Sequence, residues 1–128
     1  RASGTAAHVR IAGAVRASAT TVAVTLQIDA GYHVNANPAS EDYLIATALS
    51  FEGLGPVRIA YPQAVPFKPS FVKTAIDVYE HTPVVVATFA AGALDDTRVL
   101  RGSVHVQACN DQICLPPSKL AVSIPLAE

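Results

Sequence analysis

The chain has 128 residues, of which 51% are hydrophobic and 15% are charged, and its formal net charge at pH 7 is −1. A chain of this length can bury a hydrophobic core, so we expect a single domain over residues 1–128. The sequence has no basic stripe that could neutralise phosphates, which argues against a nucleic-acid partner. It also has no apolar run as long as a membrane span, and its first residues lack the apolar core of a signal peptide.

The apolar residues are mainly Val, Ala, Ile and Leu, and they recur in short alternating runs that favour strands over helices. The clearest run begins at Thr21, and its inward face carries Val22, Val24, Leu26 and Ile28. Glycines and prolines separate it from further runs of the same kind. We expect these runs to form strands near residues 7–15, 57–61, 74–81, 84–92, 101–109 and 119–126.

One segment, residues 37–51, is compatible with two structures. Asn37 could cap a helix that has Pro38 in its first turn. The apolar residues from Tyr43 to Phe51 also alternate as in a strand. We expect a turn at residues 38–42 followed by a strand.

The sum is seven to nine short strands with turn residues between them. Such a pattern is typical of an all-β fold. We expect an immunoglobulin-like antiparallel β-sandwich, with a closed barrel as the alternative.

The two cysteines of the chain are Cys109 and Cys114, and they lie between the last two expected strands. The pair should therefore face each other at the mouth of a hairpin, at one end of the sandwich. A disulfide that closes so short a loop contributes only about 2 kcal/mol in the chain-entropy model. It is thus a poor staple, and its position suits exchange with a partner.

Three interpretations of the pair stay open on the residues alone. The spacing by itself favours a passive structural disulfide in an exported protein. A redox-active dithiol is the second. A metal site is the weakest, because structural zinc takes four ligands and the only further candidates are His33 and His105.

Three stretches together resemble a known family: "GYHVNANP", "YPQAVPF" and "QACNDQICLPP", in this order. They resemble the N-terminal periplasmic (alpha) domain of the thiol:disulfide interchange protein DsbD family. The resemblance runs from about residue 21 to the end of the chain. It implies an immunoglobulin-like fold with a redox-active pair, Cys109 and Cys114, and an activity of the protein-disulfide reductase type that needs no cofactor.

The resemblance also implies a location and partners. The location is the bacterial periplasm, as the soluble part of an inner-membrane protein whose membrane domain lies outside this chain. A thioredoxin-like domain would donate electrons, and a disulfide isomerase or a cytochrome c maturation protein would accept them. The alternative function is a non-enzymatic β-sandwich binding module with a passive disulfide.

Roles for individual residues follow from the resemblance alone. Cys114 would form the mixed disulfide with the partner, and Cys109 would resolve it. An aromatic residue in a proline-rich loop would cover the pair until a partner arrives. Phe71 is the first candidate for this cap and Phe67 the second.

The resemblance places two further side chains near the cysteines, His33 and Asn35, where relatives have tyrosines. A histidine beside a thiol can favour the thiolate if its ring is charged, so His33 could tune the pair. The chain departs from the family beside the cap, where Lys68–Ser70 replace the acidic residues that are often found there.

Overall fold

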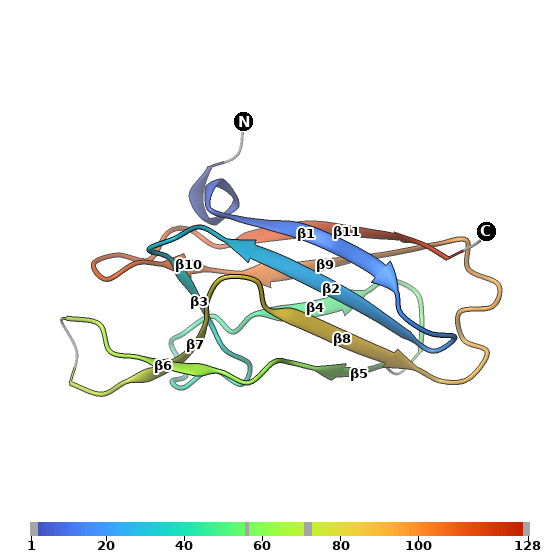
Figure 1. The fold of residues 1–128 in the computed structure, drawn as a ribbon, viewed down its shortest axis with the longest axis horizontal. Helices are drawn as coiled ribbons and strands as arrows, with labels where there is room; N and C mark the ends of the chain where they lie inside the picture. The colour runs from blue at the N-terminus through green and yellow to red at the C-terminus, as the bar shows by residue number, and fades with distance from the viewer. Residues whose placement is uncertain (1–2, 56, 71–72, 127–128) are drawn as a thin grey trace.

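The computed structural model describes residues 3–55, 57–70 and 73–126, and strands make up nearly all of its regular structure (Figure 1). A short 3-10 helix, η1, spans Gly4–Ala7. The strands are β1 (Val9–Arg16), β2 (Thr21–Ile28), β3 (His33–Asn35), β4 (Ala48–Phe51), β5 (Val57–Ala60), β6 (Val65–Phe67), β7 (Ile76–Tyr79), β8 (Val84–Phe89), β9 (Val99–Val106), β10 (Ala108–Cys109) and β11 (Ser118–Pro125).

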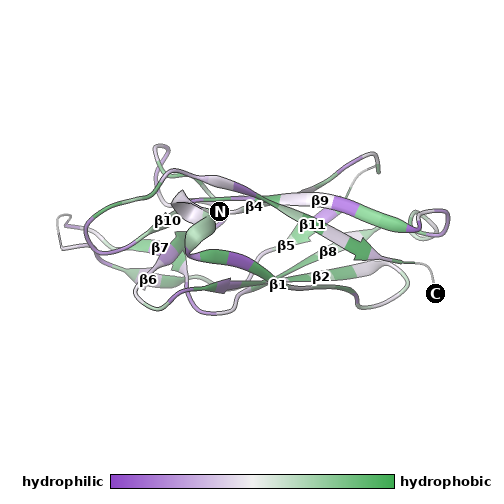
Figure 2. Cartoon of the chain, turned by 90° about the horizontal axis from the view of Figure 1, so that it is seen from above, coloured by the Kyte–Doolittle hydropathy of each residue, from purple (hydrophilic) through white to green (hydrophobic). Residues whose placement is uncertain are grey.

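Two antiparallel sheets form the body of the molecule. One has the strand order β1-β2-β8-β5, and the other has the order β11-β9-β4. Every second residue of β2 is buried, as its alternation predicts, and Val22, Val24 and Leu26 are fully inaccessible. Green hydrophobic stretches run along β2, β8 and β11 in Figure 2. The rings of Phe51 and Phe89 meet edge-on across the two sheets, with 5.4 Å between their centroids.

The expected immunoglobulin-like antiparallel β-sandwich is thereby confirmed. Each core Val or Leu side chain that is removed from water contributes about 1.5–3 kcal/mol. The core between the two sheets therefore contributes apolar burial that is independent of the disulfide.

A third antiparallel sheet, in the order β10-β3-β7-β6, lies at one end of the sandwich. Its strands continue from the body of the molecule: β10 follows β9, β3 follows β2, and β7 leads into β8. The hairpin loop after β10 projects from this end in Figure 1. This end sheet carries the cysteines.

Two expected strands differ from the observed ones. The strand expected over residues 43–51 begins only at Ala48, and Tyr43 stands 76% exposed in a turn. The reason is that Asn35 in β3 binds the segment before Ala48. Its side chain donates a hydrogen bond to the main-chain carbonyl of Ile45, and its main-chain carbonyl accepts one from the Thr47 hydroxyl. The strand expected over residues 101–109 is divided at Gln107. Its first part pairs with β11 and β4, and its second part pairs with β3.

The 3-10 helix η1 clamps the hairpin that bears the cysteines. The Thr5 side-chain Oγ1 accepts a hydrogen bond from the buried amide of Ala108, at 2.9 Å. The Thr5 amide donates to the carbonyl of Pro116, at 3.0 Å. Gly4 has φ +58° and lies against Pro116, so a side chain there would be both strained and crowded. One residue, Thr5, therefore holds the arm before Cys109 and the arm after Cys114.

We predict that Thr5→Val destabilises the fold by about 1–3 kcal/mol, because the buried Ala108 amide loses its acceptor while the shape of the side chain is kept. Thr5→Ser keeps the hydroxyl and is the matched control, with a smaller loss from the missing methyl group. Urea unfolding of the three proteins measures the difference. Equal midpoints for Thr5→Val and the natural chain would show that the clamp contributes nothing.

Candidate redox site

The cysteines form a disulfide between two residues that face each other across a hairpin. The S–S distance is 2.06 Å, and the two Cα atoms are 3.9 Å apart. Main-chain hydrogen bonds flank the pair on both sides, from Asn110 to Ile113 and from Leu115 to Ala108, each 2.8 Å long. Cys109 and Cys114 are thus a non-hydrogen-bonded antiparallel pair, the arrangement that brings opposite side chains closest together.

The loop between the cysteines is tied by its own side chain. Asn110 Oδ1 accepts hydrogen bonds from the amides of Gln112 and Ile113, each at 2.8 Å. Asparagine commonly stabilises tight turns in this way. The loop geometry therefore rests on hydrogen bonds as well as on the disulfide.

The two sulfur-bearing residues differ in exposure. Cys109 is only 4% exposed and ends strand β10, whereas Cys114 is exposed beyond the turn. Exchange requires an incoming sulfur to approach in line with the S–S bond. Cys114 is therefore the more accessible residue of the pair.

A pocket of about 280 Å³ opens beside the disulfide. The structure brings two of the expected site residues, His33 and Asn35, to this pocket together with both cysteines. The sequence pointed to neither Tyr43 nor Pro69, which also line it. The local pattern predicts a strand at Tyr43. The residue is instead exposed in a turn, because Asn35 of β3 binds the segment that follows it, at Ile45. Pro69 sits in the loop expected to carry the cap.

His33 lies directly opposite Cys109 in the pairing of β3 with β10. Its side chain is 2% exposed, and its ring packs on Phe67 with 4.2 Å between centroids. Burial lowers the pKa of His33, and the carboxylates of Glu80 and Asp111 oppose that effect more weakly. Burial thus favours the neutral ring over the charged imidazolium, and the tuning of the cysteine pair by His33 stays a prediction.

The turn that precedes β3 is anchored to His8, the residue before β1, and this anchoring helps to position His33. His8 Nδ1 lies 3.0 Å from Asp29 Oδ2, and the His8 ring stacks on Tyr32 with 4.0 Å between centroids. The Asp29 amide also donates to the carbonyl of His8. The start of β3 is thus fixed before it reaches the cysteine hairpin.

Asn35 is completely buried on the same face of β3 as His33. Its Nδ2 donates to the carbonyl of Ile45 at 3.0 Å. Within the described residues its Oδ1 has no hydrogen-bond partner. Asn35 therefore joins the end sheet to the segment before β4, and one of its polar atoms stays unpaired at the wall of the pocket.

The expected cap falls partly outside the described residues. Phe71, the first candidate, lies outside them. Phe67, the second, packs on His33 rather than lying free in the loop. The segment that follows Phe67 reaches the cysteine loop, because the Ser70 amide donates to Asp111 Oδ1 at 3.0 Å. The loop between β6 and β7 is thus tied to the turn between Cys109 and Cys114.

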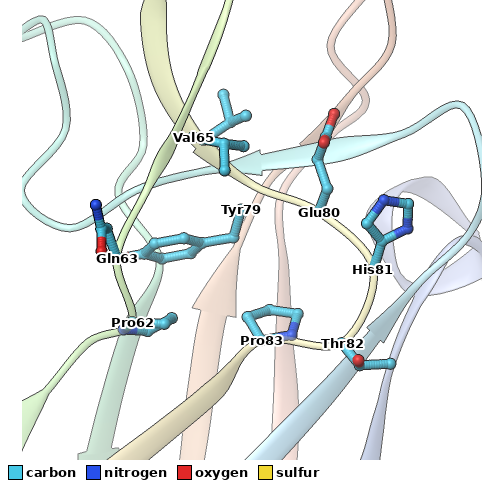
Figure 3. Close-up of a pocket in the computed structure, with 9 residues that line it drawn as sticks. Pro62, Gln63, Val65, Tyr79, Glu80, His81, Thr82 and Pro83 are labelled. Atoms are coloured by element: carbon cyan, nitrogen blue, oxygen red, sulfur yellow. The ribbon is translucent and has the colours of Figure 1, made fainter.

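Two other features do not coincide with the disulfide. A separate pocket of about 220 Å³ beside β7 is lined by Tyr79, Pro62 and Pro83, and no cysteine borders it (Figure 3). Burial raises the pKa of the Tyr79 hydroxyl, which accepts a hydrogen bond from the amide of Asn37.

His105, a candidate metal ligand, is exposed on β9 and does not border the pocket at the cysteines. In the described ranges no group of three or more His, Cys, Asp or Glu side chains could hold a metal ion.

Comparison with known proteins adds two kinds of similarity. The family model described as "Thiol:disulfide interchange protein DsbD, N-terminal" matches residues 5–125. A crystal structure of the N-terminal periplasmic domain of ScsB from Proteus mirabilis aligns with a TM-score of 0.62 and 15% identity. That alignment covers 90% of this chain and 46% of the ScsB chain, so this chain spans less than half of it.

A second crystal structure, of the Neisseria meningitidis DsbD N-terminal domain in the reduced form, aligns with a TM-score of 0.61. Its identity is 17%, and the alignment covers 88% of this chain and 82% of the other. No curated protein sequence matches the chain. Among the described residues, no helix is long and apolar enough to cross a membrane.

The family match over nearly the whole chain agrees with the fold and with the paired cysteines at its end. DsbD N-terminal domains are periplasmic and exchange thiols with disulfides, which is an oxidoreductase type of chemistry. This chain belongs to the DsbD N-terminal family of thiol–disulfide interchange domains.

Proposed function

We propose that this chain forms a single periplasmic domain that passes reducing equivalents to partner proteins through Cys109 and Cys114. The observation that carries the proposal is the disulfide itself: a short-loop bridge with one exposed and one buried residue, at the end of the sandwich. A thioredoxin-like domain is the proposed donor. A disulfide isomerase or a cytochrome c maturation protein is the proposed acceptor.

The exchange proceeds in two displacements. The Cys114 thiolate attacks a sulfur of the partner's disulfide, so that a mixed disulfide forms and one partner thiolate leaves. The Cys109 thiol then loses its proton and attacks the Cys114 sulfur, which releases the second partner thiolate. Two electrons pass to the partner, its two sulfurs take up two protons, and Cys109 and Cys114 end as a disulfide.

The exposure of the cysteines supports this order of attack. The open side of Cys114 admits a partner sulfur, whereas the buried side chain of Cys109 can reach only its neighbour across the hairpin. The hydrogen bonds that flank the pair keep Cys109 within reach of the mixed disulfide after the S–S bond has opened.

Access is the second part of the proposal. We assign the loop between β6 and β7 the role of a cover that a partner displaces, with Phe71 as its aromatic residue. The support comes from the neighbours of Phe71: Pro69 borders the same pocket as both cysteines, and Ser70 is hydrogen-bonded to Asp111. Displacement of such a cover would couple partner binding to reactivity.

The reduction potential separates interchange from a passive staple. We expect the Cys109–Cys114 pair to equilibrate with glutathione buffers at a potential above about −300 mV, because structural disulfides of secreted proteins lie below that value. The measurement is the fraction of oxidised chain across a series of buffers, quantified by alkylation of the free thiols. A potential well below this limit would favour the alternative, a binding module with a passive disulfide.

Single-cysteine variants test the roles. Cys109→Ser should accumulate a mixed disulfide with a thioredoxin-fold partner, because the exposed Cys114 attacks and no second thiol resolves the product. Cys114→Ser should accumulate little, because its remaining thiol is buried. Non-reducing electrophoresis after mixing with an oxidised disulfide isomerase gives the readout. The opposite pattern would reverse the two roles and keep the chemistry.

A further inference from the structure

The resolving step leaves one requirement unmet, which is a group that takes the proton of Cys109. Cys109 is buried, so bulk water has little access to its sulfur. A thiol attacks as its thiolate, and burial in apolar surroundings works against that charged form. The second displacement therefore needs a base that is itself inside the site.

His33 is the titratable side chain that the fold sets against Cys109. The two residues are direct partners in the pairing of β3 with β10. Side chains of directly opposite residues have Cβ atoms about 4.5–5.5 Å apart, which brings an imidazole within reach of a neighbouring sulfur. Both residues border the pocket at the disulfide. The His33 ring also packs on the Phe67 ring.

The surroundings keep His33 in the form that can accept a proton. The charged groups that act on it are Glu80, beyond β7, and Asp111, in the cysteine loop, and both favour protonation. Burial outweighs them and leaves the pKa of His33 below its ordinary value of 6.5. Glu41 lines the pocket that His33 shares with the two cysteines. Asp29, Tyr32 and His81 border a second pocket on the side of Phe67.

We propose that His33 is the general base for Cys109 and takes the thiol proton as Cys109 attacks the mixed disulfide on Cys114. This inference rests on the interchange function proposed above and assigns it a catalytic group. In the step, the Cys109–Cys114 bond forms and the bond between Cys114 and the partner breaks. The electron pair of the broken bond leaves on the partner sulfur. The proton moves from Cys109 to a ring nitrogen of His33 and then to the departing thiolate or to water.

The same arrangement works in reverse when a donor reduces the disulfide. A donor thiolate that attacks Cys114 expels Cys109 as a buried thiolate. His33 takes up the proton that the donor thiol lost, or one from water, and passes it to that sulfur, so the base of one direction is the acid of the other. Cys114, which faces solvent, needs no such partner.

The experiment uses the reduced chain and a chromogenic aryl disulfide, dithiobis(nitrobenzoate), under stopped flow. Attack of Cys114 on the reagent releases the first coloured arylthiolate, at a rate that depends on the reagent concentration. The second arylthiolate is released when Cys109 resolves the mixed disulfide, at a rate that is independent of the reagent concentration. We expect His33→Gln to slow the second phase about 10²-fold at pH 7, the lower range for loss of a general base, and to leave the first phase unchanged.

The pH profile separates proton transfer from packing. In the natural chain the second phase should lose speed only below the lowered pKa of His33. In His33→Gln the rate should instead rise with pH as the buried Cys109 thiol ionises without a base, so the break at the lowered pKa of His33 should be missing. His33→Phe keeps a ring against Phe67 and should behave like His33→Gln, which excludes a loss of packing as the cause. His105→Gln, on the exposed face of β9, is the matched control and should behave like the natural chain.

Each outcome decides a separate point. Identical second phases and pH profiles in His33→Gln and the natural chain would overturn the role of His33 and leave interchange intact. Absence of any second phase in the natural chain, with a lasting adduct on Cys114, would overturn the proposed function itself. A second phase restored in His33→Phe but not in His33→Gln would also overturn proton transfer, because it would assign the effect to ring packing.

Discussion

The site depends on one constraint, the antiparallel pairing of Cys109 with Cys114 across a tight hairpin. Hydrogen bonds on both sides of the pair hold the backbone of the hairpin in addition to the disulfide. Thr5 adds an external clamp, because its side chain and amide bind the two arms of the hairpin. The buried core between the sheets stabilises the fold by apolar burial that does not depend on the S–S bond.

The end sheet holds the residues around the cysteine pair in fixed positions. Its strands are short and lie next in the chain to strands of the sandwich, and this connection limits where they can lie. Strand β3 places His33 against the buried cysteine, and the turn beyond β10 leaves Cys114 in the open. A site built in this way has one cysteine that faces solvent and one that faces protein. That asymmetry supports the order of attack proposed above.

The sequence predicted much of this structure because period-two alternation is a local signal. The inward face of β2 was predicted residue by residue, as was the position of the cysteines at the mouth of a hairpin. The roles of η1 and Thr5 were not predictable, because they depend on a contact between residues more than a hundred positions apart. The late start of β4 was not predicted either, because Asn35 binds the segment before β4, and period-two alternation carries no signal for that contact. The cap on Phe71 remains a prediction, because that residue lies outside the described ranges.

The central claim is that the fold survives when the disulfide opens. Chemical unfolding of the natural chain, with and without a reductant such as dithiothreitol, tests it most directly. The account predicts that the reduced chain stays folded at ordinary temperature and loses only about 2 kcal/mol of unfolding free energy, the entropic share of so short a loop. A reduced chain that is unfolded at ordinary temperature would contradict the claim and make the disulfide a structural staple.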